Sequence, residues 1–409
     1  MSLKEEALIF HRKTKGKISV ESKSVVENAH DLSLAYSPGV AEPVKEIAFD
    51  PEMAYYYTSK WNMVAVVTDG SAILGLGNLG ALASLPVMEG KAVLFKKFGG
   101  VDAFPICLNT KDTEKIIETV KLLEPVFGGV NLEDISAPRC FEIEKVLREE
   151  LSIPVFHDDQ HGTAIITLAG LYNALKIVGK KIGEIKVVIN GAGAAGISIA
   201  KLLIHMGVKD VILCDTKGAI YSGRPQGMNP YKDEIAQITN SEMEKGTLAD
   251  AMKGSDVFIG VSARDVVNQK MVKSMAKDPI IFACANPDPE INPNAAKEAG
   301  AAVVATGRSD FPNQINNVLG FPGLFRGVLD VRARVINDDM NVAAAVAIAD
   351  FVDDSKLSPD YIVPSPLDLE IYPRVAAAVA KAAMKSGVAR FAILPIDVEL
   401  NARRLLGLS

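Results

Sequence analysis

The segment KVVINGAGAAGISIAKLLIH, residues 186–205, is the strongest indication of the fold, because an apolar strand runs into a glycine-rich turn and then into a helix. In this GxGxxG pattern, Gly191 permits the tight turn, Gly193 lets the backbone approach a pyrophosphate, and Gly196 lets the helix pack closely on the strand. The free N–H groups and positive dipole end of the helix attract phosphates. The stretch therefore predicts a Rossmann-like dinucleotide site, and the alternative is a glycine turn without a ligand. The predicted phosphate-binding residues are Gly191, Ala192, Gly193, Ala194, Ala195 and Gly196.

The next apolar run, DVILCD, ends at Asp215, about twenty residues beyond Gly196. A carboxylate at this place accepts hydrogen bonds from the ribose hydroxyls and repels a 2′-phosphate, which favours NAD. Lys217 lies two residues further on and would offset that repulsion. We therefore expect NAD as the cofactor and leave NADP open.

Short apolar runs alternate with amphipathic stretches on both sides of this turn. Strands that alternate with helices indicate βαβ units and a parallel sheet, so we predict an α/β fold. The expected strands before the turn cover residues 61–69, 101–108, 128–134 and 153–159. The expected strands from the turn onward cover residues 185–190, 210–215, 255–261, 279–286 and 301–306. The expected helices include residues 111–127, 138–151 and 161–180.

A chain of 409 residues accommodates two or three domains, at about 100–200 residues each. We predict an N-terminal α/β domain over residues 1–160. A doubly wound, Rossmann-like NAD(P)-binding domain is expected over residues 161–370. A helical tail over residues 371–409 is expected to pack back on the body.

Composition excludes several classes of protein. The formal net charge of -6 and the absence of a basic cluster argue against a nucleic-acid partner. No apolar run reaches the 18 or so residues of a membrane span, and the N-terminus lacks the apolar region of a secretory signal. The widely spaced cysteines indicate reduced thiols, so a cytoplasmic protein is expected. These cysteines are Cys107, Cys140, Cys214 and Cys284.

A second glycine motif, GLGNLG at residues 75–80, also matches GxGxxG. Pro86 follows soon after its last glycine, and a proline there is expected to break the helix that would receive a phosphate. We therefore expect a turn at the edge of the first domain here and assign the dinucleotide to the other motif.

Two pairs of acidic residues follow expected strands. Glu133 and Asp134 come after GGVNL, and Asp158 and Asp159 come after IPVFH. In open α/β sheets, ligands gather outside the carboxyl ends of strands. Carboxylates that meet there repel one another unless they share a cation or a proton, and oxygen ligands suit Mg²⁺ or Mn²⁺. A metal site is one interpretation; solvated loop acids and helix caps are the other.

His157 and His161 flank the second acidic pair as HDDQH. Their spacing matches that of the zinc-protease helix, but that motif needs glutamate directly after the first histidine. Aspartate stands there instead, so we expect ordinary hydrogen-bonding roles for both histidines.

Seven segments, in this order along the chain, resemble the malic enzyme family in its short bacterial and archaeal form. They lie between about residues 36 and 330. The segments are AYSPGVAEP, VTDGSAILGLGNLGALASLPVMEGKAVLFK, NLEDISAPRCFEIE, VFHDDQHGTA, INGAGAAG, CANPDPE and FPNQINNVLGFPG.

The resemblance implies roles for residues that would otherwise be interpreted as turn formers or solvated side chains. Tyr36 corresponds to the general acid of the family and Lys91 to its general base. Asp158 corresponds to an acidic neighbour near that base. Asn286 and Asn317 correspond to asparagines that bind the substrate carboxylate, and Asn286 also borders the cofactor. The implied metal ligands are Glu133, Asp134 and Asp159.

The resemblance implies metal-dependent oxidative decarboxylation of (S)-malate to pyruvate and CO₂, with reduction of NAD(P). A lysine acts as the base only when unprotonated, and a nearby cation together with partial desolvation is expected to lower the pKa of Lys91. Malolactic conversion to lactate and a non-catalytic nucleotide-binding regulator are the alternatives. The resemblance also implies a homodimer or larger assembly, in which a neighbouring chain would complete the site. Ala72 stands where longer members carry an arginine for the substrate carboxylate.

Overall fold

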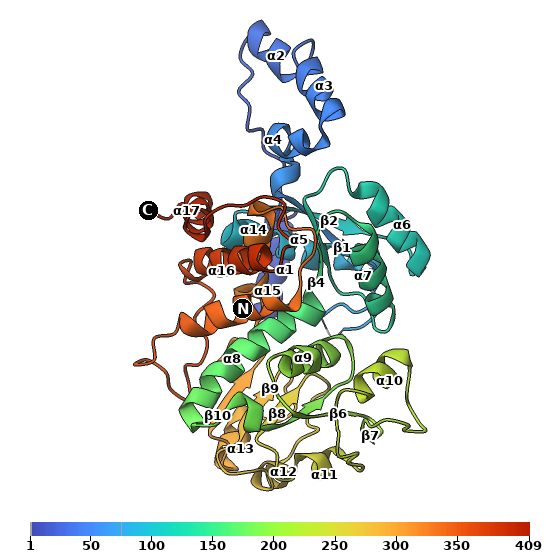
Figure 1. Cartoon of the computed structure of the whole chain (residues 1–409), viewed down its shortest axis with the longest axis vertical. Helices are drawn as coiled ribbons and strands as arrows, with labels where there is room; N and C mark the ends of the chain where they lie inside the picture. The colour runs from blue at the N-terminus through green and yellow to red at the C-terminus, as the bar shows by residue number, and fades with distance from the viewer. Residues whose placement is uncertain (1, 75) are drawn as a thin grey trace.

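The computed structural model describes residues 2–74 and 76–409, which form two parallel sheets with helices on their faces (Figure 1). The first sheet has the order β2-β1-β3-β4 and the second the order β10-β9-β8-β5-β6-β7. All strand pairs are parallel except that of β6 with the short β7. The predicted α/β fold is confirmed. The strands are β1 (Met63–Thr68), β2 (Asp102–Cys107), β3 (Gly129–Leu132), β4 (Val155–His157), β5 (Lys186–Asn190), β6 (Asp210–Asp215), β7 (Gly218–Ala219), β8 (Val257–Gly260), β9 (Ile280–Ala283) and β10 (Val303–Thr306).

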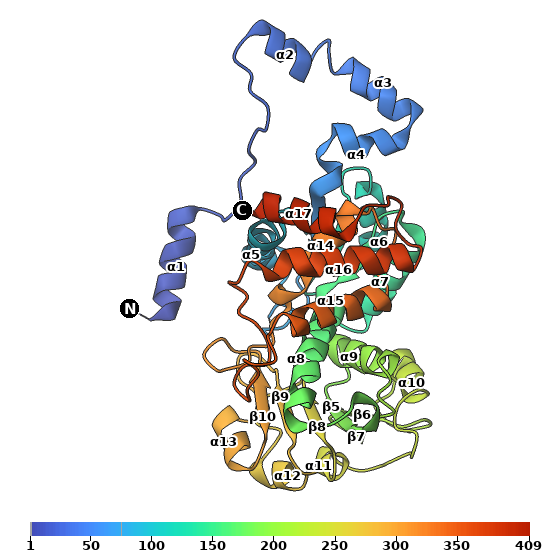
Figure 2. The same cartoon turned by 60° about the vertical axis from the view of Figure 1, so that its left-hand side comes forward.

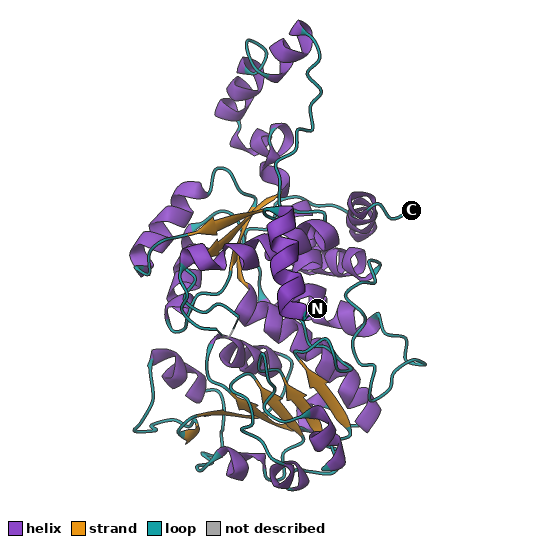
Figure 3. Cartoon of the chain, turned by 180° about the vertical axis from the view of Figure 1, so that it is seen from behind, coloured by secondary structure: helices purple, strands orange, loops and turns teal. Residues whose placement is uncertain are grey.

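The strands lie where the apolar runs predicted them. Most of these runs are buried on both faces, whereas β2, at the edge of the first sheet, is only partly buried. Val187 of β5 pairs with Val211 of β6 and with Val257 of β8, and all three side chains are fully buried. Figure 3 shows helices on both sides of the second sheet. Such continuous apolar strands are typical of parallel sheets covered by helices.

Three helices accompany the first sheet: α5 (Ala81–Gly99), α6 (Thr113–Leu123) and α7 (Arg139–Glu150). α5 corrects one expectation, because it begins directly after Gly80 and continues through Pro86. A proline removes one helical hydrogen bond and crowds the carbonyl of the residue four positions earlier, here Leu82. That loss falls near the start of the helix, where the Leu82 side chain is exposed. Gly75 of this motif lies outside the described residues.

α8 (Thr163–Val178) leads from the first sheet to the second. Most of its side chains are buried on all sides, which agrees with its nearly continuous apolar sequence. The second sheet carries the helices α9 (Ala194–His205), α10 (Pro230–Ala236), α11 (Leu248–Met252), α12 (Gln269–Lys273) and α13 (Pro293–Glu298).

The chain returns to the first sheet with α14 (Phe321–Asp330), which packs against α5. α15 (Asp338–Asp350), α16 (Ile371–Lys385) and α17 (Pro395–Leu406) complete this helical layer. The helices approach closely at Gly327, where a Cβ atom would lie 2.3 Å from the carbonyl oxygen of Ala376. The layer thus begins at Phe321, and the predicted tail from residue 371 forms its last part.

An N-terminal arm between about residues 24 and 51 stands away from the body (Figures 1 and 2), while Lys23 just before it still contacts Asp102 at 3.4 Å. It follows α1 (Leu3–Thr14) and contains α2 (Ala29–Ala35) and α3 (Ala41–Phe49), in which no residue is buried. α4 (Ala54–Tyr57) anchors the arm, since the Arg332 guanidinium lies 4.8 Å from the Tyr55 ring centroid. Within the described ranges, no helix is both long and apolar enough to cross a membrane.

Candidate active site

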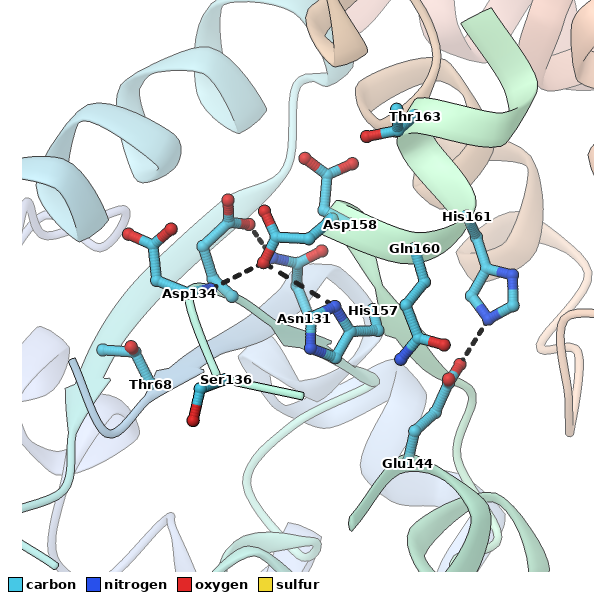
Figure 4. Close-up of polar contacts among 12 residues, drawn as sticks. Thr68, Asn131, Asp134, Ser136, Glu144, His157, Asp158, Gln160, His161 and Thr163 are labelled. Carbon is cyan, nitrogen blue, oxygen red and sulfur yellow. Dashed lines mark hydrogen bonds and ion pairs between the residues drawn. The ribbon is translucent and has the colours of Figure 1, made fainter. Parts of the chain in front are cut away.

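The two acidic pairs meet at the carboxyl edge of the first sheet (Figure 4). β3 and β4 are adjacent, with Leu132 paired to His157, so the residues that follow each strand become neighbours. Carboxylate oxygens of Glu133, Asp134 and Asp159 lie within 4.8 Å of one another. The predicted metal ligands are thus brought together.

The electrostatics of this cluster fit a divalent cation. Burial, followed by the charge of Asp159, raises the pKa of Asp134 to about 7. Burial also raises the pKa of Glu133 well above its usual value. Oδ2 of Asp134 is buried without a hydrogen-bond partner among the described residues. A cation held by these oxygens would offset the repulsion between carboxylates, and an all-oxygen set suits Mg²⁺ or Mn²⁺.

Lys91, from the middle of α5, reaches into this cluster. Its Nζ lies 2.6 Å from Oδ2 of Asp158 and 3.0 Å from Oε1 of Glu133. It also lies 4.4 Å from the ring centroid of Phe321 on α14. Burial alone would lower the pKa of Lys91, but Asp158 and Glu133 together raise it above its usual range. Burial thus acts in the direction expected from the sequence, whereas the two carboxylates, whose close approach to the amine the sequence did not reveal, act against it.

Asp158 has no exposed surface and begins η3 (Asp158–Gly162), a π-helical turn after β4. The turn is compact, since a Cβ atom on Gly162 would lie 2.0 Å from Oδ1 of Asp158. Asn317, predicted to bind substrate, donates from Nδ2 to Oδ2 of Asp158 at 3.0 Å. The structure therefore places Asn317 next to Asp158 and Lys91.

The opposite side of η3 carries His161, whose Nε2 lies 2.6 Å from Oε1 of buried Glu144 on α7. Burial alone would raise the pKa of Glu144, but His161 holds it below its usual value. His157 differs from the expected hydrogen-bonding role, because neither ring nitrogen has a hydrogen-bond partner among the described residues, although Nδ1 lies 3.8 Å from Oδ2 of Asp159. Burial lowers its pKa and favours the neutral ring.

The glycine-rich turn has the geometry of a dinucleotide site. Gly191 has a φ of 118°, and a Cβ atom there would lie 2.5 Å from the carbonyl oxygen of Val261. A Cβ atom on Gly196 would lie 1.8 Å from the carbonyl oxygen of Gly191. Gly193, in contrast, has no atom within 4 Å of such a Cβ, and its backbone begins α9 at an open surface. Two glycines thus shape the turn, while the third leaves room for a ligand.

A cavity of about 850 Å³ lies beside this turn. Asp215 borders it and is held by two cations that sequence reasoning missed. Nη1 and Nη2 of Arg224 donate to the carboxylate at 2.8 and 2.5 Å, and Nζ of Lys232 donates at 2.6 Å. Burial alone would raise the pKa of Asp215, but these bonds hold it well below its usual range. Lys217 donates its backbone N–H to Asp215 and also lines the cavity.

Two predicted residues do not join the acidic cluster within this chain. Tyr36 ends α2 on the N-terminal arm, with 71% of its surface exposed. Asn286 follows β9 and is exposed. It lies beside Gly307, since a Cβ atom on Gly307 would be 3.0 Å from Nδ2 of Asn286. Ala72 contributes its backbone, whose N–H donates to the carbonyl of Asp134 at 2.9 Å.

Two family models match most of the chain. The model described as "Malic enzyme, N-terminal domain" matches residues 15–148, and "Malic enzyme, NAD binding domain" matches residues 160–384. The "Bifunctional malic/malolactic enzyme" of Bacillus subtilis is 64% identical over 405 residues, which cover 99% of each chain. The "NAD-dependent malic enzyme" of Geobacillus stearothermophilus is 58% identical over 381 residues, which cover 93% of this chain and 79% of that protein.

Solved structures agree with these matches. The crystal structure of the malic enzyme of Pyrococcus horikoshii has a TM-score of 0.96 and 52% sequence identity, and the match covers 99% of this chain and 96% of that one. Further relatives that match over most of this chain are named NADP-dependent malic enzymes.

Proposed function

Because this chain belongs to the malic enzyme family, an oxidoreductase family, we propose that it converts (S)-malate to pyruvate and CO₂ with reduction of NAD(P). The observation that carries the proposal is the contact of Lys91 with Asp158 and Glu133, beside carboxylates that fit a divalent cation. A base next to a cation site meets the need of the first step, in which the C2 hydroxyl loses its proton as hydride leaves.

In this proposal Lys91 takes the hydroxyl proton at Nζ. Asp158 holds that amine in place, and Asn317 in turn holds Asp158. Glu133, Asp134 and Asp159 would hold Mg²⁺ or Mn²⁺. When bound, the cation supplies positive charge that favours the unprotonated form of Lys91 and stabilises negative charge on the substrate oxygen.

We propose NAD as the preferred cofactor, with NADP accepted less well. Asp215 occupies the position at which a carboxylate binds the ribose. Arg224 is fully engaged with Asp215, so its guanidinium is not free to receive a 2′-phosphate. Lys217 and Lys245 also line the cavity and are the cations that would attract such a phosphate. Steady-state kinetics with NAD and NADP tests this cofactor preference, and a higher kcat/KM for NADP than for NAD would contradict it.

Oxidative decarboxylation itself is tested by following reduced nicotinamide in the presence of malate and Mn²⁺, with and without a chelator. The expected result is pyruvate and reduced cofactor in equal amounts, and no turnover with the chelator. Absence of both products with malate under saturating Mn²⁺ and cofactor would refute the proposal.

The malolactic reaction is the second candidate, because the similar B. subtilis protein is named for both reactions. In that reaction the reduced cofactor is consumed again and lactate is released. Measuring lactate and free reduced cofactor together separates the two: lactate without net reduction of the cofactor would favour the malolactic reaction.

We further propose that the enzyme is a homodimer in which the N-terminal arm delivers Tyr36, the general acid, to the partner's site. Several large apolar side chains of this arm are exposed and would be covered in an assembly. They are Leu32, Leu34, Val44 and Phe49. A tyrosine on an arm that stands away from its own body needs such an arrangement to reach a substrate.

Complementation between two inactive variants tests this assembly. Tyr36→Phe and Lys91→Ala chains are co-expressed with different tags, and the mixed dimer is purified. A shared site predicts recovery of one intact site per mixed dimer, about half of the wild-type activity per dimer. Recovery of no activity in a confirmed mixed dimer would place both residues in one chain's site and refute the exchange.

A further inference from the structure

Glu290, in the loop after β9, is a fully buried carboxylate that the proposed reaction does not use. Its Oε1 accepts the backbone N–H of Ser262 at 2.8 Å and lies 3.3 Å from the Ser262 hydroxyl. Its Oε2 accepts the backbone N–H of Ala285 at 3.0 Å. A buried carboxylate is costly unless hydrogen bonds compensate it, and here both oxygens have donors.

Ser262 extends this network to the glycine-rich turn. Nδ2 of Asn190 donates to Oγ of Ser262 at 2.7 Å. The hydroxyl accepts this bond and is free to donate its own hydrogen to Glu290. Asn190 is the last residue of β5 and stands directly before Gly191. The network therefore connects the ends of β5, β8 and β9 at one edge of the sheet.

The backbone around Glu290 also forms hydrogen bonds with the loop after β8. The carbonyl of Glu290 accepts the N–H of Val267 at 3.0 Å, and the carbonyl of Pro289 accepts the N–H of Asp265 at 3.2 Å. This loop borders the cavity beside the glycine-rich turn, since Ser262, with its neighbours Ala263 and Val266, lines that cavity. On the other side, Ala285 precedes Asn286.

We propose that Glu290 is a positioning residue for the dinucleotide: it holds the loops after β8 and β9 at the spacing that the cofactor requires. A side chain that served only to fill space would not need two oxygens aimed at the donors of two different loops. The inference rests on the dinucleotide binding of the proposed function.

The test is Glu290→Gln, which keeps the volume but turns an NH₂ group towards one of the two backbone N–H donors. Donor then faces donor, and the two loops move apart. The expected result is a Kd for NADH that rises about tenfold, equivalent to about 1.4 kcal/mol, with a parallel rise in KM for NAD. Glu298→Gln is the matched control, because Glu298 lies on the exposed face of nearby α13. It should bind NADH as the unchanged enzyme does.

A second variant separates an effect on NADH affinity from an effect on folding. Ser262→Ala removes the hydroxyl that connects Asn190 to Glu290 but leaves the backbone bond, so a smaller rise of about threefold in Kd is expected. A lower melting temperature with unchanged NADH affinity in both variants would show that the carboxylate only stabilises the fold, and would overturn the inference. If the unchanged enzyme bound neither NADH nor NADPH, the proposed function would fail instead.

Discussion

Asp158 shows how the site is assembled at the scale of single residues. Its carboxylate contacts Lys91 at 2.6 Å and Asn317 at 3.0 Å, and these partners come from α5 and from the segment before α14. Buried charges are stable only when they are paired and hydrogen-bonded. The three side chains therefore support one another, and changing one alters the other two.

Replacing Lys91 with alanine is expected to lower kcat by about 10²–10⁴-fold, the usual contribution of a positioned base. NADH affinity should remain, because the glycine-rich turn lies on the other sheet. Lys97→Ala is the matched control on the same helix, and it should keep full activity because Lys97 is exposed. Normal malate oxidation by the Lys91→Ala enzyme would show that another group takes the proton.

In the Gly162→Ala variant, the new methyl group would lie only 2.0 Å from Oδ1 of Asp158, which is too close for the present arrangement. Asp158 or Asn317 must move, so kcat is expected to fall at least about tenfold while the fold persists. Gly183→Ala serves as the control, because its nearest heavy atom would be 3.6 Å away, an ordinary contact. Equal activity of the two variants would mean that catalysis does not depend on the present position of the Asp158 carboxylate.

The acidic residues could be predicted from the sequence, since each pair directly follows an apolar run and parallel strands place such residues together. Arg224 and Lys232 could not be predicted. They reach Asp215 from the segment after β7 and from α10, and no regular spacing connects them to it. Side-chain pairing across loops depends on tertiary structure.

At the level of secondary-structure elements, α14 supports the site by packing between α5 and α16. Its Phe321 ring faces Lys91, and its Gly327 lets α16 approach. Close helix packing of this kind requires a residue without a side chain at the crossing point. The position of Lys91 therefore depends on contacts between α5, α14 and α16.

Gly327→Ala is expected to lower the melting temperature by at least about 2 °C. Alanine normally favours a helix by up to about 1 kcal/mol over glycine, but a methyl group 2.3 Å from the carbonyl of Ala376 forces the helices apart. Thermal unfolding followed by circular dichroism measures the shift. A higher melting temperature would show that the helices separate without cost.

The strands and several helices could be predicted because their apolar runs are regular, whereas the short helices α10 to α13 were not predicted. α5 shows where such reasoning failed: Pro86 was expected to break it, yet it lies inside an uninterrupted helix of 19 residues. One missing hydrogen bond near a helix start costs less than the burial of Met88, Ala92 and Phe95 contributes.

At the scale of the whole molecule, a cation bound by Glu133, Asp134 and Asp159 would couple folding to metal binding. Saturating Mn²⁺ should raise the melting temperature, since a ligand at about 100 times its Kd contributes about 2.7 kcal/mol. Glu133→Gln should lose most of this shift, whereas Glu142→Gln, an exposed carboxylate on α7, should keep it. No Mn²⁺-dependent shift in the unchanged protein would argue against the metal site.

The α/β fold, the glycine-rich turn and the acidic strand ends follow from the sequence alone, because these depend on local patterns of apolar residues, glycines and carboxylates. The tertiary structure was needed to show that Lys91 contacts Asp158 and Glu133, that Arg224 and Lys232 hold Asp215, and that Tyr36, at the end of α2 on the arm, lies apart from the cluster. Those facts depend on how distant segments pack, and packing involves residues that no short stretch of sequence brings together.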